Sequence, residues 1–587
     1  MNTRWSEYYK KNERQTDLDL TRTLYESVAA VAEEYPDRIA IEHGTALFSY
    51  RMLIDEIDRT AYSLEKLGVG RGDKVAVATN GIPATVFAIY ALNKLGATAC
   101  MMDHRITRNR FVSEANKCGF KLAFMTAELF GRLSPVIADT SVVTVIISRV
   151  RDYFPLRDRF NLDVRKIVSF DKVRYDHSLM PDDFRLVMWD KMIKENREFT
   201  NREAAERPAD ETSFLFFSGY AEDEQTAVCV SDQAINSAVS LEMFMIANPD
   251  GTAGGRRVLS YVEKAFVYGF AIGIHMALAG GNTLLLCAAD PSEFPTAEVN
   301  FYKPDVFVAY PSIVCGFVDN VRIHDTALTE LKVIISGGDL FGGARLNNVV
   351  YFLRERGSEA VIYQTYGTAE TMSVAIFRPI ITDSDRLLGI PVPGVAVKIC
   401  ERDTMGEMPV GKKGEICVLT PARISSYYEN VDLDHKMLRH QPDGRVWVLT
   451  GDIGHIDERG MIYFDGNSKR SIERHGTLIY PQVIESEIKN VYGVTDVCVV
   501  PVAKKDGTCD LIAVVEPISD YLFNNERLRN LKSSIELECS LVLSPPMIPD
   551  DVEFRAYIPK GAYGRPNYAE IAESVAQNRL NTEESRD

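Results

Sequence analysis

Short apolar runs alternate with helical patterns along the first four hundred residues. Runs typical of buried strands stand at 74–78, 122–125, 142–147, 306–308 and 333–336. Amphipathic or apolar helical patterns lie between strand signals, for example over 24–32 and 83–95. Strands that are apolar on both faces and alternate with helices are typical of parallel sheets covered on both sides. The pattern therefore predicts an α/β fold with parallel αβ sheets.

The pattern of apolar and polar residues changes twice toward the C-terminus. From about residue 386, short strand patterns separated by Gly and Pro turns predict a small β-barrel subdomain over about 386–466. A polar joint then precedes a new pattern of helices and strands, which predicts a small, mobile α+β C-terminal domain. We expect a large N-terminal domain over 1–466, the small domain over 467–575 and a disordered tail over 576–587.

One apolar run, 265–289, has the length of a membrane span. Gly269, Gly273 and the turn at 280–282 interrupt it. We interpret the run as a buried helix, turn and strand, and expect no integral membrane segment; a membrane span is the alternative.

Composition narrows the class of protein. The net charge of −17 argues against a nucleic-acid partner, which would call for a basic surface. The ten cysteines include no Cys-x-x-Cys pair, which is typical of reduced thiols rather than a disulfide framework or a zinc site. We expect a cytoplasmic protein.

The segment 363–371, Tyr-Gln-Thr-Tyr-Gly-Thr-Ala-Glu-Thr, is the strongest local candidate for chemistry. A strand pattern ends there in a turn at Gly367, and Glu370 follows. Ligands of open α/β sheets commonly bind at the carboxyl ends of strands. Tyr366 could therefore present an aromatic face to a ligand, and Glu370 a carboxylate to a metal ion.

This segment resembles the Tyr-Gly-x-Thr-Glu motif of adenylate-forming enzymes, which include acyl-CoA synthetases, peptide-synthetase adenylation domains and luciferases. Further segments resemble that family's motifs, in the family's order, along nearly the full chain. They are 69–80, 334–339, 389–394, 414–415, 450–452, 466–472, 476–485 and 559–565.

The resemblance implies ATP-dependent activation of a carboxylic acid to an acyl-AMP, followed by transfer to the thiol of CoA or of a carrier-protein phosphopantetheine. Catalytic roles fall to Arg565 and to Glu370, which would hold Mg²⁺. The implied nucleotide-binding residues are Ser218, Gly219, Gly338, Gln364, Tyr366, Gly367, Thr368, Asp452 and Asn467. The implied acyl pocket comprises Phe266, Tyr268, Gly269, Tyr310 and Gly337. The implied thiol-acceptor loop contains His475 and Gly476, and the implied hinge is Lys469 with Arg470.

Several positions depart from the family pattern. The phosphate loop should be Gly-rich with a lysine, but residues 222–224 are acidic and Gln225 stands at the lysine position. Carboxylates cannot cradle phosphates as a Gly-rich loop does. Asn467 replaces an arginine, and Arg565 replaces the adenylation lysine, for which Lys560 is a second candidate. The alternative is thus a catalytically impaired or altered relative that binds an acyl ligand, a nucleotide or an acyl carrier protein.

The acid itself is only broadly indicated. Amino-acid-activating members of the family place an Asp near the first acyl-pocket segment, and none stands among 266–270. A small-molecule acyl or aryl acid therefore fits better than an amino acid.

Overall fold

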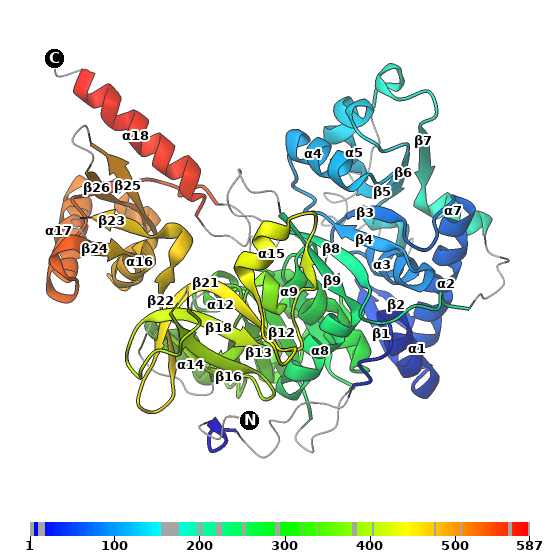
Figure 1. Ribbon diagram of the computed structural model, residues 1–587, viewed down its shortest axis with the longest axis horizontal. Helices are drawn as coiled ribbons and strands as arrows, with labels where there is room; N and C mark the ends of the chain where they lie inside the picture. The colour runs from blue at the N-terminus through cyan, green and yellow to red at the C-terminus, as the bar shows by residue number, and fades with distance from the viewer. Residues whose placement is uncertain are drawn as a thin grey trace.

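The computed structural model shows two large sheets followed by a smaller C-terminal lobe (Figure 1). It describes residues 5–9, 18–153, 175–196, 198, 203–218, 226–248, 254–287, 294–320, 322–339, 341–378, 384, 386–401, 404–474, 477–504, 508–560 and 566–584.

The first sheet has eight strands and a parallel centre. Its order is β19 (Ser426–Tyr427), β9 (Thr226–Ser231), β8 (Thr212–Ser218), β4 (Thr98–Met101), β3 (Lys74–Ala78), β5 (Leu122–Thr126), β6 (Thr144–Ser148) and β7 (Arg185–Met188). Strands β8 to β7 are parallel, whereas β9 and β19 add antiparallel pairs at one edge. The central strand β3 is buried along most of its length, as a strand covered on both faces must be.

The second sheet has fourteen strands. Its order is β17 (Ala396–Cys400), β18 (Gly414–Leu419), β21 (Val446–Ile456), β22 (Ile462–Asn467), β16 (Leu387–Pro391), β15 (Ile376–Arg378), β14 (Val361–Tyr366), β13 (Val333–Ser336), β12 (Val306–Ala309), β10 (Arg257–Tyr261), β11 (Thr283–Leu285), β1 (Ile39–His43) and β2 (Ala46–Ser49), with β20 (Leu438–His440) on β21. Strands β14 to β1 are parallel. The short strands after residue 386 are antiparallel and continue this same sheet through β16.

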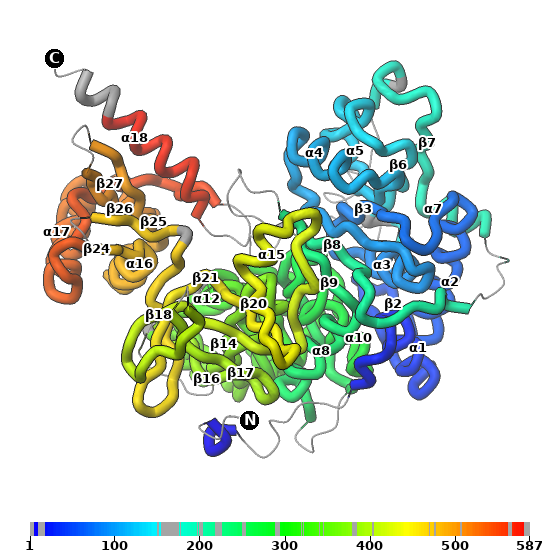
Figure 2. The backbone as a smooth tube through the Cα atoms, in the orientation of Figure 1, coloured from blue at the N-terminus to red at the C-terminus, as the bar shows by residue number. Residues whose placement is uncertain are grey.

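Helices cover these sheets, and the chain trace shows how they surround them (Figure 2). They are α1 (Leu24–Glu34), α2 (Tyr50–Lys66), α3 (Pro83–Leu95), α4 (Arg108–Cys118), α5 (Ala127–Leu133), α7 (Trp189–Glu195), α8 (Asp232–Glu242), α9 (Val267–Phe270), α10 (Met276–Ala279), α11 (Thr296–Tyr302), α12 (Pro311–Asp319), α13 (Asp325–Glu330), α14 (Gly343–Glu355) and α15 (Val431–Met437). Local sequence sets their ends: Thr23 and Glu26 form a capping box at α1, and α3 begins at Pro83.

The described part of the apolar run 265–289, residues 265–287, is interior structure. It forms α9, a π-helical turn over Ala271–His275, α10 and then β11, all of them buried. Among the described residues, no helix combines the length and the apolarity needed to cross a bilayer.

The small C-terminal lobe has its own apolar core. It contains the hairpin β23 (Ile472–Arg474) and β24 (Thr477–Ile479), the sheet β25 (Val494–Ala503), β26 (Cys509–Pro517) and β27 (Asp551–Phe554), and helices α16 (Pro481–Lys489), α17 (Asn525–Val542) and α18 (Tyr568–Glu584).

The tail expected to be disordered from residue 576 is helical as far as Glu584. Ile571 and Val575 are buried, and they anchor α18 on the lobe. Arg579, one turn later, donates to Asp551 at 2.9 Å. One narrow apolar stripe and an ion pair thus extend the helix through a polar sequence.

Candidate active site

Tyr366, Asp452 and Asn467 form one hydrogen-bonded group. The Tyr366 hydroxyl donates to Asp452 Oδ2 at 2.7 Å, and Asn467 Nδ2 donates to Asp452 Oδ1 at 2.5 Å. Three strands separate β21 from β14 in the sheet order, so the antiparallel end of the sheet must curl to bring Asp452 to Tyr366. Burial and the neighbouring Asp452 carboxylate raise the pKa of Tyr366 well above its ordinary value.

Glu370 lies in the short helical turn η8 (Ala369–Thr371), which follows β14 and whose N-cap residue is Thr368. One of its carboxylate oxygens, Oε1, accepts a hydrogen bond from the Tyr427 hydroxyl at 2.5 Å. Tyr427 belongs to β19, so this contact joins the turn after β14 to the other sheet. Sequence reasoning missed Tyr427, because a two-residue strand leaves no periodic signal.

Gly367 allows the turn between Tyr366 and Glu370. A Cβ at this position would lie 2.3 Å from the carbonyl carbon of Ser373, where the chain folds back on itself. Any side chain would therefore displace the backbone. The turn holds Tyr366 and Glu370 close in space as well as in sequence.

Gln364 has a buried side chain, 3% exposed, and its Oε1 has no hydrogen-bond partner within the described part of the chain. Its strand neighbour in the register is Ser336, at the end of β13. The end of β14, the turn after β13 and η8 therefore lie along one edge of the fourteen-stranded sheet.

The residues of the expected acyl pocket also come together. A Cβ on Gly337 would lie 3.1 Å from the Tyr268 hydroxyl, and a Cβ on Gly338 would lie 3.2 Å from the ring of Tyr310. Phe266 and Gly269 flank Tyr268 at the start of α9, and all three are buried. The pocket region thus adjoins the turn after β13.

Arg470 is fixed in the small lobe. Its guanidinium donates to Glu485 Oε2 at 3.0 Å and Oε1 at 2.7 Å, and lies 3.3 Å from the centre of the Tyr568 ring. The expected hinge pair Lys469 and Arg470 forms the turn η9 (Ser468–Arg470) between β22 and β23. The Arg470 side chain therefore belongs to the small lobe by its contacts.

Lys560 is paired within the small lobe and lies near the large domain. Its Nζ donates to Asp496. Burial, together with the cations of Lys489 and Arg345, lowers the pKa of Lys560 to about 8, and the charge of Asp339 in the large domain opposes this shift. Asp339 follows Gly338, so the segment after β27 faces the turn after β13.

Other expected site residues lie outside the described part of the structure. They are Gly219, the acidic residues 222–224, Gln225, His475, Gly476 and Arg565. Ser218 is the last residue of β8.

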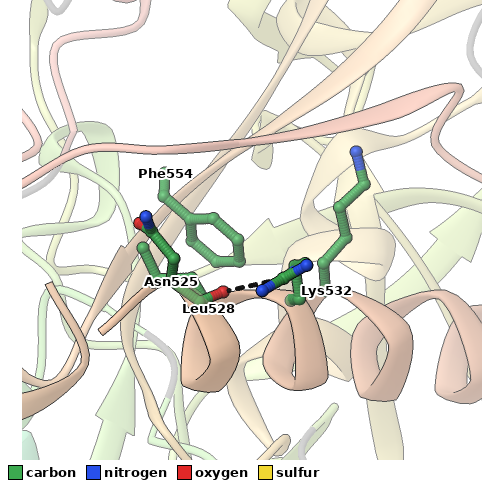
Figure 3. Close-up of a pocket in the computed structure, with 5 residues that line it drawn as sticks. Asn525, Leu528, Lys532 and Phe554 are labelled. Carbon is green, nitrogen blue, oxygen red and sulfur yellow. Dashed lines mark hydrogen bonds between the residues drawn. The ribbon is translucent and has the colours of Figure 1, made fainter. Parts of the chain in front are cut away.

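The small lobe has a surface pocket whose residues are far in sequence from Tyr366, Glu370 and Asp452. Asn525, Leu528, Arg529 and Lys532 of α17 line it together with Phe554 of β27 (Figure 3). None of these residues belongs to the expected site, so we assign the pocket no part in it.

A family model described as AMP-binding enzyme matches residues 28–428. The chain belongs to this family. The match spans more than half of the chain and confirms the resemblance drawn from the motifs.

The similarity to individual proteins extends beyond residues 28–428. The long-chain-fatty-acid–CoA ligase of Bacillus subtilis (strain 168) is 24% identical over 567 residues, which cover 95% of each chain. That of Haemophilus influenzae is 22% identical over 580 residues and 96% of each chain. Among solved structures, an anthranilate CoA ligase in complex with anthranoyl-AMP superposes with a TM-score of 0.78 at 15% identity, over 96% of this chain and 99% of that one. A benzoate CoA ligase from Burkholderia xenovorans LB400 gives 0.75 at 16%, over 94% of this chain and 100% of that one. These superpositions confirm the expected α/β fold with a separate small C-terminal domain.

Proposed function

We propose that this AMP-binding enzyme is an AMP-forming acid–thiol ligase. In the first half-reaction an acid carboxylate attacks the α-phosphorus of ATP, giving an acyl-AMP and pyrophosphate. In the second, a thiol attacks the acyl carbon, giving a thioester and AMP. The observation that carries the proposal is the meeting of Tyr366, Asp452 and Glu370 at one edge of the fourteen-stranded sheet.

In this proposal the nucleotide lies along that edge. The Tyr366 ring would stack on adenine, and Gln364, whose side-chain oxygen lacks a partner within the described residues, would accept from the adenine amine. Asp452 would accept from the ribose hydroxyls. In this structure its oxygens are held by Tyr366 and Asn467, so ribose binding exchanges or shares those hydrogen bonds.

Glu370 fits a magnesium site. Its side chain is partly exposed, and the Tyr427 hydroxyl donates to its Oε1. Mg²⁺ prefers hard carboxylate oxygens and usually takes one or two of them together with substrate phosphates. A bound Mg²⁺ would offset the repulsion between the acid and the triphosphate. Tyr427 would then orient the carboxylate through its hydroxyl.

The remaining roles rest on the family resemblance. Arg565, with Lys560 as the second candidate, would serve the first half-reaction. The loop with His475 and Gly476 would serve the second, after the small domain rotates about Lys469 and Arg470. The family and its relatives support CoA as the acceptor; a carrier-protein phosphopantetheine remains the second candidate. The cytoplasmic location stays a prediction.

Isotope exchange between ATP and pyrophosphate, run across aliphatic, aryl and amino acids, tests the proposal. We expect exchange that depends on an acid and on Mg²⁺, and that Asp452→Ala strongly reduces. Absence of exchange with every acid, in a sample that circular dichroism shows to be folded, would refute it.

A second candidate function, a non-catalytic relative, is favoured by one observation: Gln225 and Arg565 stand where the family has lysines. Calorimetric titration with ATP and Mg²⁺ separates the two, since a non-catalytic relative that has lost the nucleotide site gives no heat of binding. The family match and the ligase relatives favour the enzyme.

A further inference from the structure

Glu242 is a buried carboxyl group that the proposed chemistry does not use. It is the last residue of α8 and is 0% exposed. Within the described part of the chain, neither carboxyl oxygen has a hydrogen-bond partner. Burial alone raises the pKa of Glu242 to about 8, and no neighbouring cation offsets this rise.

Aromatic packing places the end of α8 beneath β14. Phe244, two residues beyond Glu242, packs edge-on against Tyr363 and Phe377, with ring centres 6.2 and 5.4 Å apart. Tyr363 and Thr365 point to the same face of β14, because strand side chains alternate. The end of α8 therefore lies against the face of β14 that carries Thr365.

The same face borders the expected acyl pocket. A Cβ on Gly337 would lie 2.5 Å from Thr365 Oγ1 and 3.1 Å from the Tyr268 hydroxyl, so these two hydroxyls adjoin the pocket glycine. The charge of Glu242 acts on Tyr268, whose pKa it helps to raise. Glu242 thus lies close enough to Tyr268 for its charge to act there, beside the expected acyl pocket.

A buried carboxyl group without a donor is destabilising for the free protein. Nearly all buried polar groups in native structures are hydrogen-bonded, and an apolar side chain would pack at such a position without loss. Buried carboxyl groups with strongly shifted protonation occur often at functional sites. A bound molecule can supply the missing donor, because neither the Tyr268 nor the Thr365 hydroxyl, the two donors that adjoin the pocket glycine, is hydrogen-bonded to Glu242.

We propose that Glu242 recognises a hydroxyl or amino group at the far end of the acid substrate. The enzyme would thus act on polar-ended acids rather than on acids that end in plain alkyl or aryl groups. This inference rests on the proposed function, because it assigns a side chain beside the same acyl pocket. It also separates this chain from what the names of its fatty-acid relatives would suggest.

Matched pairs of acids, in which methyl replaces hydroxyl, test this inference. The pairs are 4-hydroxybenzoate with 4-methylbenzoate, and 8-hydroxyoctanoate with nonanoate. For at least one pair we expect kcat/KM in pyrophosphate exchange to favour the hydroxy acid at least tenfold. Binding of the methyl analogue would leave the buried carboxyl group of Glu242 without a hydrogen-bond partner. The same pairs are titrated calorimetrically in the presence of a non-hydrolysable ATP analogue.

Glu242→Leu should invert this preference, and Glu242→Gln, which keeps hydrogen-bonding groups, should retain at least part of it. Equal kcat/KM within both pairs, or the same preference in wild type and Glu242→Leu, would overturn the assignment while leaving the ligase activity established. If no acid supports exchange, the proposed function fails, but the titrations still decide the role of Glu242. Selective binding of a hydroxy acid that Glu242→Leu abolishes supports this role. Equal or undetectable binding of all four acids rejects it. Should Glu242→Leu fail to fold, loss of selectivity in Glu242→Ala serves the same purpose.

Discussion

Replacing Arg470 with alanine should loosen the small domain. Arg470 makes two hydrogen bonds to Glu485, at 3.0 and 2.7 Å, and both side chains are largely buried, with 16% and 9% exposed. Its guanidinium also covers the ring of Tyr568 on α18. One residue therefore connects α16 to α18.

The magnitude follows from what remains after the substitution. Removing one partner of a buried ion pair costs about 3–5 kcal/mol, because the other charge stays buried without compensation. Glu485 keeps one donor, the Val499 N–H at 2.8 Å, which favours the lower end of that range. Loss of the contact with Tyr568 adds about 1 kcal/mol. We expect the small domain to lose about 3–4 kcal/mol.

Hydrogen exchange is the suitable assay, because a chain with several domains does not unfold in a single two-state step. Amides of β25 and β26 should exchange more than about 100-fold faster in Arg470→Ala, since each 1.4 kcal/mol is a factor of about ten. Arg529→Ala, which removes an exposed arginine from the same domain, is the control and should change these rates less than about threefold.

A double substitution separates the mechanisms. If the orphaned carboxylate causes the loss, Arg470→Met with Glu485→Met should exchange more slowly than Arg470→Ala alone. An increase below tenfold in Arg470→Ala, or a double variant as unstable as the single one, would refute the reasoning.

Four further substitutions test the site and the core. Tyr366→Phe removes the 2.7 Å hydrogen bond to Asp452, worth about 1 kcal/mol, and should raise the KM for ATP up to about tenfold in the exchange assay; an unchanged KM would contradict this role. Glu370→Gln should lower the exchange rate at least about 100-fold at any Mg²⁺ concentration, whereas Tyr427→Phe, which leaves the carboxylate in place, should lower it less than tenfold. Burial lowers the pKa of His275 to about 3, so the unfolded chain takes up a proton below about pH 6.5 that the native protein excludes, and stability falls by about 2 kcal/mol between pH 7 and pH 5. Denaturation midpoints of His275→Gln should lose this part of the pH dependence, and an unaltered slope would argue against it.

Sequence patterns predicted the centre of each sheet well. Strands such as β3 and β13 are apolar on both faces, and burial on both faces is what a parallel sheet requires. The edge strand β7 was not predicted, because it is only partly buried and lies in a stretch rich in charged residues. The end of α18 has no strong apolar pattern, because its polar residues rely on two buried side chains and on the ion pairs of Arg579 with Asp510 and Asp551.

The candidate site also has some residues that the sequence predicted and others that it did not. The short motif around Tyr366 and Glu370 could be found because its residues are adjacent in the sequence. Tyr427 and Glu242 could not be found, because each acts through contacts between segments that are distant in the chain. Neither residue type nor spacing indicates such a contact before the sheets are assembled.

The two-residue strand β19 limits how the large domain can be divided. It lies beyond residue 386 in the sequence, yet it completes the eight-stranded sheet by pairing with β9. A fragment that ends before residue 386 would leave the edge of β9 uncovered, and exposed strand edges promote aggregation. The large domain should therefore be expressed as one indivisible unit, and attempts to excise the β-rich region should yield insoluble material from both halves.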